Sequence, residues 1–219
     1  ARALGPAGSP AVVENLVRQM QVRPALGDVA GLQQLLVGLE AEARAANDAI
    51  LLAECLAIRG TIAMGTGDVA GATALLDQAV APARASGNGH ALQLALGNLG
   101  LLAMQQGRLD AAEPMLREQL DVCRAGGIPD GLSAALGNLA IVAQHRGDAP
   151  TALARLTEQE QLCRQVGDAQ GLVLALANRR SLLGSAANSP RYRAVATVCV
   201  GATAAMALLV VGRTVLGWL

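Results

Sequence analysis

Three asparagines are the residues of this sequence best placed for binding chemistry. Asn98, Asn138 and Asn178 recur at intervals of forty residues, inside segments whose apolar spacing predicts helices. A primary amide donates and accepts a hydrogen bond at once, as a peptide backbone does, so a row of amides can hold an extended peptide. Asn is a mediocre helix former, so three at one helical phase need a reason. The alternative, equally open, is that each amide bonds a neighbouring helix inside the fold.

Helical spacing places further side chains on the same face as these asparagines. These candidate partner-binding residues are Leu101, Gln105, Ile141, His145, Arg179 and Ser181. His145 and His90 are expected to be solvated at helix ends, because no motif places a nucleophile or a carboxylate beside them. Arg179 either gives the face a positive end for acidic partners or is a solvated residue that caps its helix.

No arrangement of residues in the sequence predicts catalysis. It contains no phosphate-binding loop, no zinc-ligand spacing and no nucleophile elbow. The cysteines (Cys55, Cys123, Cys163 and Cys199) form no CxxC pair and have no histidine cluster nearby, so we expect apolar packing rather than metal or redox chemistry. We therefore expect a protein without enzyme activity, cofactor or metal site.

Acidic residues in the later part of the chain are expected on the solvated outer faces of helices. They are Glu113, Glu118, Asp121, Glu158 and Glu160. Arg117 follows Glu113, and Arg164 follows Glu160, at the four-residue spacing of ordinary surface ion pairs.

All these residues belong to a unit that repeats along most of the chain. Gly27, Gly67, Gly107 and Gly147 align when the sequence is shifted by forty residues, and an Asp follows three of them. Self-similarity at a period of this size predicts a solenoid in which each unit packs its apolar face on the next. Asp after a turn glycine is a good N-cap, because its carboxylate accepts from free backbone N–H groups.

Apolar spacing and turn residues set the expected elements. A first helix is expected over residues 11–23, and a second opens at residues 27–28. The following helices are expected over residues 49–64, 69–85, 90–106, 109–125, 132–146, 151–165 and 172–184. The fold class is therefore all-α. It is an α-solenoid of antiparallel hairpins over residues 11–184, with about four helix pairs and a final single helix, after a flexible lead-in over residues 1–10.

Composition supports this fold and limits the partners. The chain is 53% hydrophobic but only 1% aromatic and has no Phe, so its core must be Leu, Ala and Val, which suits close helix packing. Every basic residue is Arg, which with abundant Ala and Gly indicates a GC-rich bacterial genome. The formal net charge of zero argues against a general nucleic-acid binder, because no excess of cations can replace phosphate counterions.

The residues within each unit resemble the tetratricopeptide repeat. One copy reads L-x2-L-G-x2-A over residues 96–103, then Gly107, then A-x3-L over residues 112–116, and the copies forty residues away are similar. Leu and Ala replace the aromatics of the family pattern, the closing Pro is missing, and the period is forty instead of thirty-four. The longer period resembles the repeats of kinesin light chains and of many bacterial regulatory proteins.

That resemblance implies a right-handed α-solenoid whose concave face holds a peptide or a partner protein. It implies that the first helix of each pair lines the groove. It also implies that an Asn in the place of Asn98, Asn138 and Asn178 points into the groove and bonds the ligand backbone.

Composition changes after residue 184. Residues 185–193 read as a polar linker, and residues 194–212 run nineteen positions without a charge, close to the length that crosses a bilayer. Arg191 and Arg193 precede this apolar helix and Arg213 follows it, which puts the repeats on the cytoplasmic side of a bacterial inner membrane and residues 213–219 outside as a short tail. We favour this span over a buried helix that covers the end of the solenoid.

The leading functional hypothesis is a non-enzymatic interaction scaffold, anchored to the membrane, that binds a peptide or partner protein in its concave groove. The alternative is the sensor arm of a larger bacterial signalling protein, whose nucleotide-binding switch or transcriptional regulator domain would lie upstream of Ala1. A third hypothesis is an accessory subunit of a membrane assembly. The complete open reading frame would separate the first two.

Overall fold

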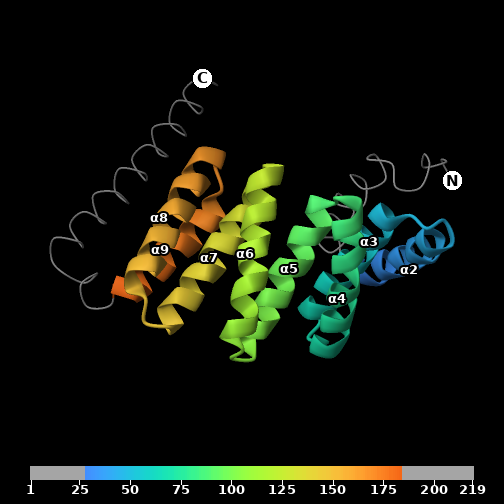
Figure 1. Ribbon diagram of the computed structural model, residues 1–219, viewed down its shortest axis with the longest axis horizontal. Coiled ribbons are helices and arrows are strands. Elements are labelled where there is room, and N and C mark those ends of the chain that lie inside the picture. Colours follow the sequence, from blue (N-terminus) through green and yellow to red (C-terminus); the bar gives the residue numbers. More distant parts are fainter. Residues whose placement is uncertain (1–27, 184–219) are drawn as a thin grey trace, which may run out of the picture.

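The described part of the chain is a row of helices packed side by side (Figure 1). The computed structural model describes residues 28–183, which contain helices and turns and no strand. The helices are α2 (Val29–Ala45), α3 (Ala49–Gly65), α4 (Val69–Ser86), α5 (Gly89–Gln105), α6 (Leu109–Gly126), α7 (Pro129–His145), α8 (Ala149–Val166) and α9 (Ala169–Leu183). The all-α solenoid architecture predicted from the sequence is confirmed for this range.

Turns recur every twenty residues, at half the sequence period. Gly67, Gly107 and Gly147, which the sequence places in turns, have φ values of 82°, 73° and 75°. Left-handed backbone of this kind is favourable for glycine because it has no Cβ. The turns midway between them also use glycine: Gly87, Gly127 and Gly167. Asn47, with φ of 51°, takes this place in the first described turn, as Asn tolerates this backbone region.

Most helices begin at a side chain that accepts from the backbone three residues on. Asp48, for example, accepts from the Leu51 N–H at 3.1 Å. The same bond is made by Asp28, Asp68, Asn88, Asp148 and Asp168. Ile128 has no capping side chain, and Pro129 opens α7 instead, three residues before the predicted start, because proline is preorganised for a first helical position.

Small residues let the two helices of a hairpin approach closely. A Cβ on Gly100 of α5 would lie 2.6 Å from Leu116 Cδ2 of α6, so the leucine occupies the space that a side chain would need. Leu116 is fully buried, as are Leu76 and Leu156 at the equivalent places of the neighbouring hairpins. This contact explains the small residue in the L-x2-L-G-x2-A pattern.

The helices form two rows of different spacing. The backbones of α3 and α5, of α5 and α7, and of α7 and α9 come within 8 Å of one another. In residues 28–183 the backbones of α2, α4, α6 and α8 make no such approach to one another. The first helices of the hairpins are therefore the inner row of a curved stack, and the second helices are the outer row.

Arginine side chains bridge the outer row at the repeat period. Arg84 of α4 donates to Glu118 of α6 at 2.8 and 2.6 Å. Arg124 of α6 bonds Glu158 of α8 in the same way. Glu118 and Glu158 therefore lie on the outer surface, as predicted, but they also connect successive repeats. Exposed pairs of this kind contribute only about 0–1 kcal/mol each to stability.

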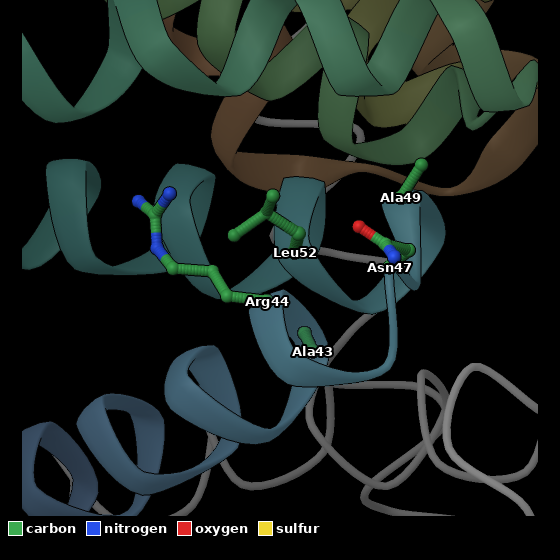
Figure 2. A pocket seen from close by; sticks show the side chains of 5 residues that line it. All are labelled: Ala43, Arg44, Asn47, Ala49 and Leu52. Atoms are coloured by element: carbon green, nitrogen blue, oxygen red, sulfur yellow. The ribbon is translucent and has the colours of Figure 1, made fainter.

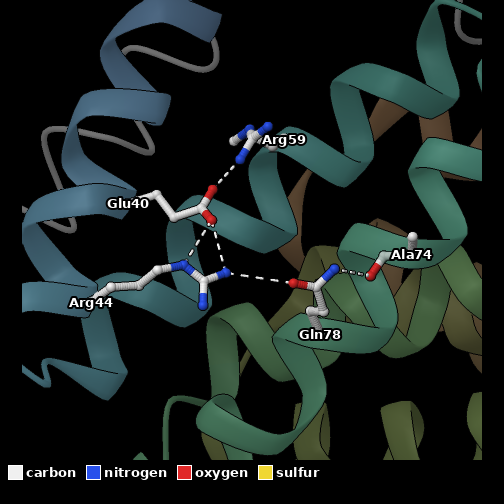
Figure 3. A network of polar contacts seen from close by, with 5 residues as sticks. All are labelled: Glu40, Arg44, Arg59, Ala74 and Gln78. Atoms are coloured by element: carbon white, nitrogen blue, oxygen red, sulfur yellow. Dashed lines mark hydrogen bonds and ion pairs between the residues drawn. The ribbon is translucent and has the colours of Figure 1, made fainter.

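Figure 3 shows the network that begins this series. The Glu40 carboxylate of α2 accepts from Arg44 at 2.9 Å and from Arg59 of α3, and Arg44 also reaches Gln78 Oε1 of α4 at 3.5 Å. These bonds therefore join the outer helices α2 and α4 with the inner helix α3 at the first described step of the stack.

A second glutamate is bonded in the same manner at the other end. Glu160 of α8 is buried and pairs with Arg164 and with Arg179 of α9. The prediction of a solvated outer position for Glu160 is wrong, because the carboxylate lies between two helices. Its pairing with Arg164 is confirmed.

Several predicted segments lie outside the described residues. These are the lead-in over residues 1–10, the helix over 11–23, the turn residue Gly27, the linker over 185–193, the apolar helix over 194–212 and the tail over 213–219. Within residues 28–183, no helix has the length and apolar character needed to cross a bilayer.

Candidate functional site

One narrow stripe of each central inner helix is left uncovered by packing. Between Ala91 and Ala103 of α5, the only residues that are not buried are Leu94, Asn98 and Leu101. On α7, the residues forty positions later are also accessible: Ala134, Asn138 and Ile141. We call these six residues the inner stripe. They lie on the inner row of the stack, and an asparagine is the middle residue on each helix.

The predicted neighbours of the asparagines continue this stripe. Leu101 and Ile141 are half-buried, and Gln105 and His145 are exposed one turn later at the ends of α5 and α7. The spacing of four and three residues keeps all of them on one helix face. The structure thus brings together four of the predicted residues around Asn98 and Asn138.

Asn98 has a partner inside the fold. Its Nδ2 donates to Thr61 Oγ1 of α3 at 2.8 Å, and the Thr61 hydroxyl donates to the Ala57 carbonyl at 2.9 Å. This bond crosses from one hairpin to the next and supports the packing of α3 on α5. The Oδ1 of Asn98 makes no hydrogen bond within the described residues.

Asn138 and Asn178 do not share this bond. In the next two repeats the place of Thr61 is taken by Leu101, which faces Asn138, and by Ile141, which faces Asn178. Neither side chain offers a hydrogen-bond acceptor. Within residues 28–183 the half-buried Asn138 side chain has no hydrogen-bond partner, and Asn178 Nδ2 is buried without one. The Asn138 amide is half-buried and not bonded within the described fold, so it is the asparagine of the inner stripe whose donor and acceptor are both available to a ligand.

Arg179 is bonded within the fold. Its Nη1 donates to Glu160 Oε2 at 2.8 Å, so this cation is already paired with a carboxylate of α8. Arg180, the next residue, is exposed. Ser181, another predicted groove residue, is exposed as well.

His90 is not the solvated residue that the sequence predicts. Its Nδ1 lies 3.1 Å from both oxygens of Glu54, whose carboxylate is fully buried and also accepts from Asn88 Nδ2 at 3.0 Å. The hydrogen bond to Glu54 raises the pKa of His90 above its ordinary value of 6.5, although burial opposes this shift. The prediction failed because Glu54 is 36 residues away in sequence and on another helix.

A cavity of about 350 Å³ lies at the turn between α2 and α3, and Figure 2 shows the side chains that line it. It is lined by Ala43, Arg44, Asn47, Ala49 and Leu52. Among these, only Arg44 carries a charge, and its guanidinium is bonded to Glu40. The cavity therefore offers no free charged group to a ligand.

A second cavity, of about 210 Å³, lies among α6, α7 and α8. Three arginines line it: Arg117, Arg146 and Arg155. Each has a carboxylate partner, which is Glu113 for the first two and Glu158, at 3.8 Å, for the third. These pairs offset the positive charge, so the cavity is not a strong anion site.

A third cavity, of about 400 Å³, lies among the inner helices α7 and α9 and the outer helix α8. We call it the α7–α9 cavity. Its lining residues are Asp130, Ser133, Ala134, Gln159, Asp168, Gln170, Gly171 and Leu174. Ala134 belongs to the inner stripe, one helical turn before Asn138. The sequence analysis did not predict this cavity, although alignment of the repeats shows a small Ser133 in the place of Gln93.

The described thiols are packed as the sequence predicts. Cys55, Cys123 and Cys163 are buried and form no disulfide. Burial raises the pKa of Cys55 to about 12, with the Glu40 carboxylate as the next contribution, and raises the pKa of Cys123 to about 11. Among residues 28–183, no three metal-ligating side chains gather into a cluster.

Comparison with known proteins agrees with this geometry. Residues 92–165 match the family described as tetratricopeptide repeat. The crystal structure of BtubC (BKLC) from P. vanneervenii is similar, with a TM-score of 0.70 and 18% sequence identity over 91% of this chain and 82% of that chain. No curated protein matches the sequence. The family model covers α5 to α8 almost completely, so the resemblance that the residue spacing indicates, to the tetratricopeptide repeat, is confirmed for residues 92–165.

Proposed function

We propose that this protein is a non-enzymatic scaffold whose inner stripe binds an extended segment of a partner protein. The observation that carries this proposal is the accessible Asn138 amide, which lacks a partner in the described fold and lies between apolar neighbours on an otherwise buried helix face. Tetratricopeptide repeats are generally protein-binding scaffolds, which supports the same class of function.

The chemistry of the stripe suits a peptide backbone. The Asn138 amide can donate to a carbonyl and accept from an N–H of the same extended chain. Leu94, Leu101 and Ile141 flank the amides and offer apolar surface to alternate side chains of the ligand. No charged residue belongs to the stripe itself, so this part of the surface favours an uncharged, apolar stretch.

The test selects peptides from a random display library on the full chain and measures their affinity for variants. Asn138→Ala should weaken binding about tenfold, because one or two backbone hydrogen bonds are lost. Gln161→Ala is the matched control, since Gln161 is an exposed amide on the outer helix α8. Equal affinity of Asn138→Ala and the unmodified chain for every selected peptide would contradict the proposal.

We also propose that residues 194–212 hold the scaffold at a membrane with the repeats on the cytoplasmic side. Support comes from the nineteen uncharged positions and the arginines that precede them. The competing arrangement is that this segment covers α9, whose Val173 and Leu176 are 68% and 41% exposed although their equivalents Ser133 and Leu136 are buried.

Membrane fractionation with and without residues 194–219 separates the two arrangements. For an anchor, deletion moves the protein from the membrane to the soluble fraction and leaves the melting temperature of the repeats unchanged. For a cover on α9, the full chain is soluble without detergent, and the deletion lowers the melting temperature because apolar surface is uncovered.

A further inference from the structure

The α7–α9 cavity contains hydrogen-bond acceptors and carboxylates but no basic residue. Asp130 has no hydrogen-bond or ion-pair partner anywhere in the described chain. Asp168 accepts from the Gly171 N–H at 2.9 Å through one oxygen, and its other oxygen accepts from the Cys163 thiol at 3.7 Å. Two carboxylates therefore line one cavity without a cation among its lining residues.

A buried amide in the wall of the cavity also lacks a donor. Gln159 is only 1% exposed, and its Nε2 donates to Ser133 Oγ at 3.4 Å. Its Oε1 is buried and has no hydrogen-bond partner in the described structure. Such an oxygen is costly unless a donor reaches it, and Gln119 Oε1, its equivalent one repeat earlier, is also buried without a partner in the described structure.

Comparison with the preceding repeat shows why the space between α7 and α9 is open. There Gln93 takes the place of Ser133, and its Oε1 accepts from Gln119 Nε2 at 3.4 Å. A Cβ on Gly131 would lie 2.4 Å from Gln93 Oε1, so the longer side chain fills the space beside α7. Ser133 is three heavy atoms shorter and leaves the equivalent space beside α9 empty.

We propose that the α7–α9 cavity takes one arginine or lysine side chain of the segment bound along the inner stripe. Apolar groups of Ala134 and Leu174 can cover the aliphatic stem, and Asp130, Asp168 and Gln159 Oε1 accept hydrogen bonds from the charged end. Ala134 precedes Asn138 by one helical turn, so the basic residue enters beside the backbone contact. This inference rests on the proposed function of the stripe and adds the charge of its ligand.

The test uses Nα-acetyl-arginine amide as the probe and the citrulline analogue, which has the same shape without the charge. Both are titrated into the full chain labelled with nitrogen-15. We expect saturable shifts from the arginine probe at the Gln159 side-chain amide and at the backbone amides of Ser133 and Gly171. The citrulline analogue should bind at least about tenfold more weakly than the arginine probe.

Three variants locate the interaction. Asp130→Asn combined with Asp168→Asn should weaken the arginine probe about tenfold while keeping the N-cap of α9, since Asn caps as well as Asp. Ser133→Gln should abolish the shifts by filling the cavity as Gln93 does, with no change of charge. Asp68→Asn, an exposed N-cap outside the cavity, is the control that should leave the titration unchanged.

Equal binding of the arginine and citrulline probes, or full arginine binding by the double Asn variant, would overturn this inference and leave peptide binding through Asn138 intact. Conversely, loss of Asn138-dependent peptide binding with the arginine titration unchanged would remove the proposed function of the stripe but not the cation site.

Discussion

The Asn98 amide of α5 donates a 2.8 Å hydrogen bond to the Thr61 hydroxyl of α3. This bond distinguishes Asn98 from Asn138, although the two asparagines have equivalent positions in the repeat. Asn138 has no such partner within the described residues, because Leu101 stands in the place of Thr61. One amide therefore contributes to the fold, and the other is available to a ligand.

We predict that Asn98→Ala lowers the free energy of unfolding by about 1 kcal/mol, the usual contribution of one such hydrogen bond. Thr61→Val should cost a similar amount, and the double variant should cost less than the sum, because both changes remove the same bond. Asn138→Ala should change stability by less than about 0.5 kcal/mol. Urea unfolding of the four variants measures these differences, and a loss for Asn138→Ala equal to that of Asn98→Ala would contradict the distinction.

Gly107→Val should destabilise the fold by about 1–3 kcal/mol, because a β-branched residue is strained at a φ of 73°. Gly65→Ala is the matched control. Gly65 ends α3, does not have positive φ, and has nothing within 4 Å of an added Cβ. Alanine there should be neutral or slightly stabilising. Thermal unfolding compares the two, and equal melting temperatures would show that the turn does not require glycine.

Stability should fall as the pH rises above about 6.5 through the raised pKa of His90. Protonated His90 faces the buried Glu54 carboxylate, so the folded state holds this proton more tightly than the unfolded chain does. The stabilisation is fully present below the unfolded pKa and is lost once the folded pKa is passed. His90→Gln keeps a polar side chain but removes the titration, so its unfolding free energy should vary less with pH. Parallel curves for the two proteins between pH 6 and 9 would contradict this.

Glu160 and Arg179 should behave as a pair that can be replaced only together. Arg179→Leu alone should cost about 1–3 kcal/mol, because the buried Glu160 carboxylate keeps only Arg164. The equivalent residues one repeat earlier are Leu120 and Leu139, which are both buried. Glu160→Leu combined with Arg179→Leu copies that arrangement and should recover most of the loss. A double variant less stable than Arg179→Leu would show that the two steps of the stack pack differently.

The buried thiols should resist alkylation in the native protein. Cys55 and Cys123 are inaccessible, and their pKa values of about 12 and about 11 leave almost no thiolate at pH 8. Iodoacetamide should modify both only after unfolding, as peptide mapping by mass spectrometry would show. Rapid modification of either cysteine in the folded protein would indicate that its hairpin opens.

Residue types and their spacing are enough to predict the helices and their order along the chain. A glycine that tolerates left-handed backbone marks the end of most helices, and an Asp or Asn that caps the next helix follows within a few residues. Both signals are local, so the sequence shows them directly. The apolar period then requires neighbouring hairpins to stack. It also places Leu101, Gln105, Ile141 and His145 on the face of Asn98 and Asn138, since helical phase depends only on spacing.

The contacts between side chains of different helices could be seen only in the packed fold. The pairs Asn98–Thr61, His90–Glu54 and Arg179–Glu160 join residues 37, 36 and 19 positions apart on different helices. Whether an amide or a charge has a partner depends on one residue of the adjoining repeat, as Thr61 and Leu101 show. Likewise, the α7–α9 cavity is open because Ser133 takes the place that Gln93 has one repeat earlier. The forty-residue period predicts which helices pack together, but it does not predict how much space remains between them.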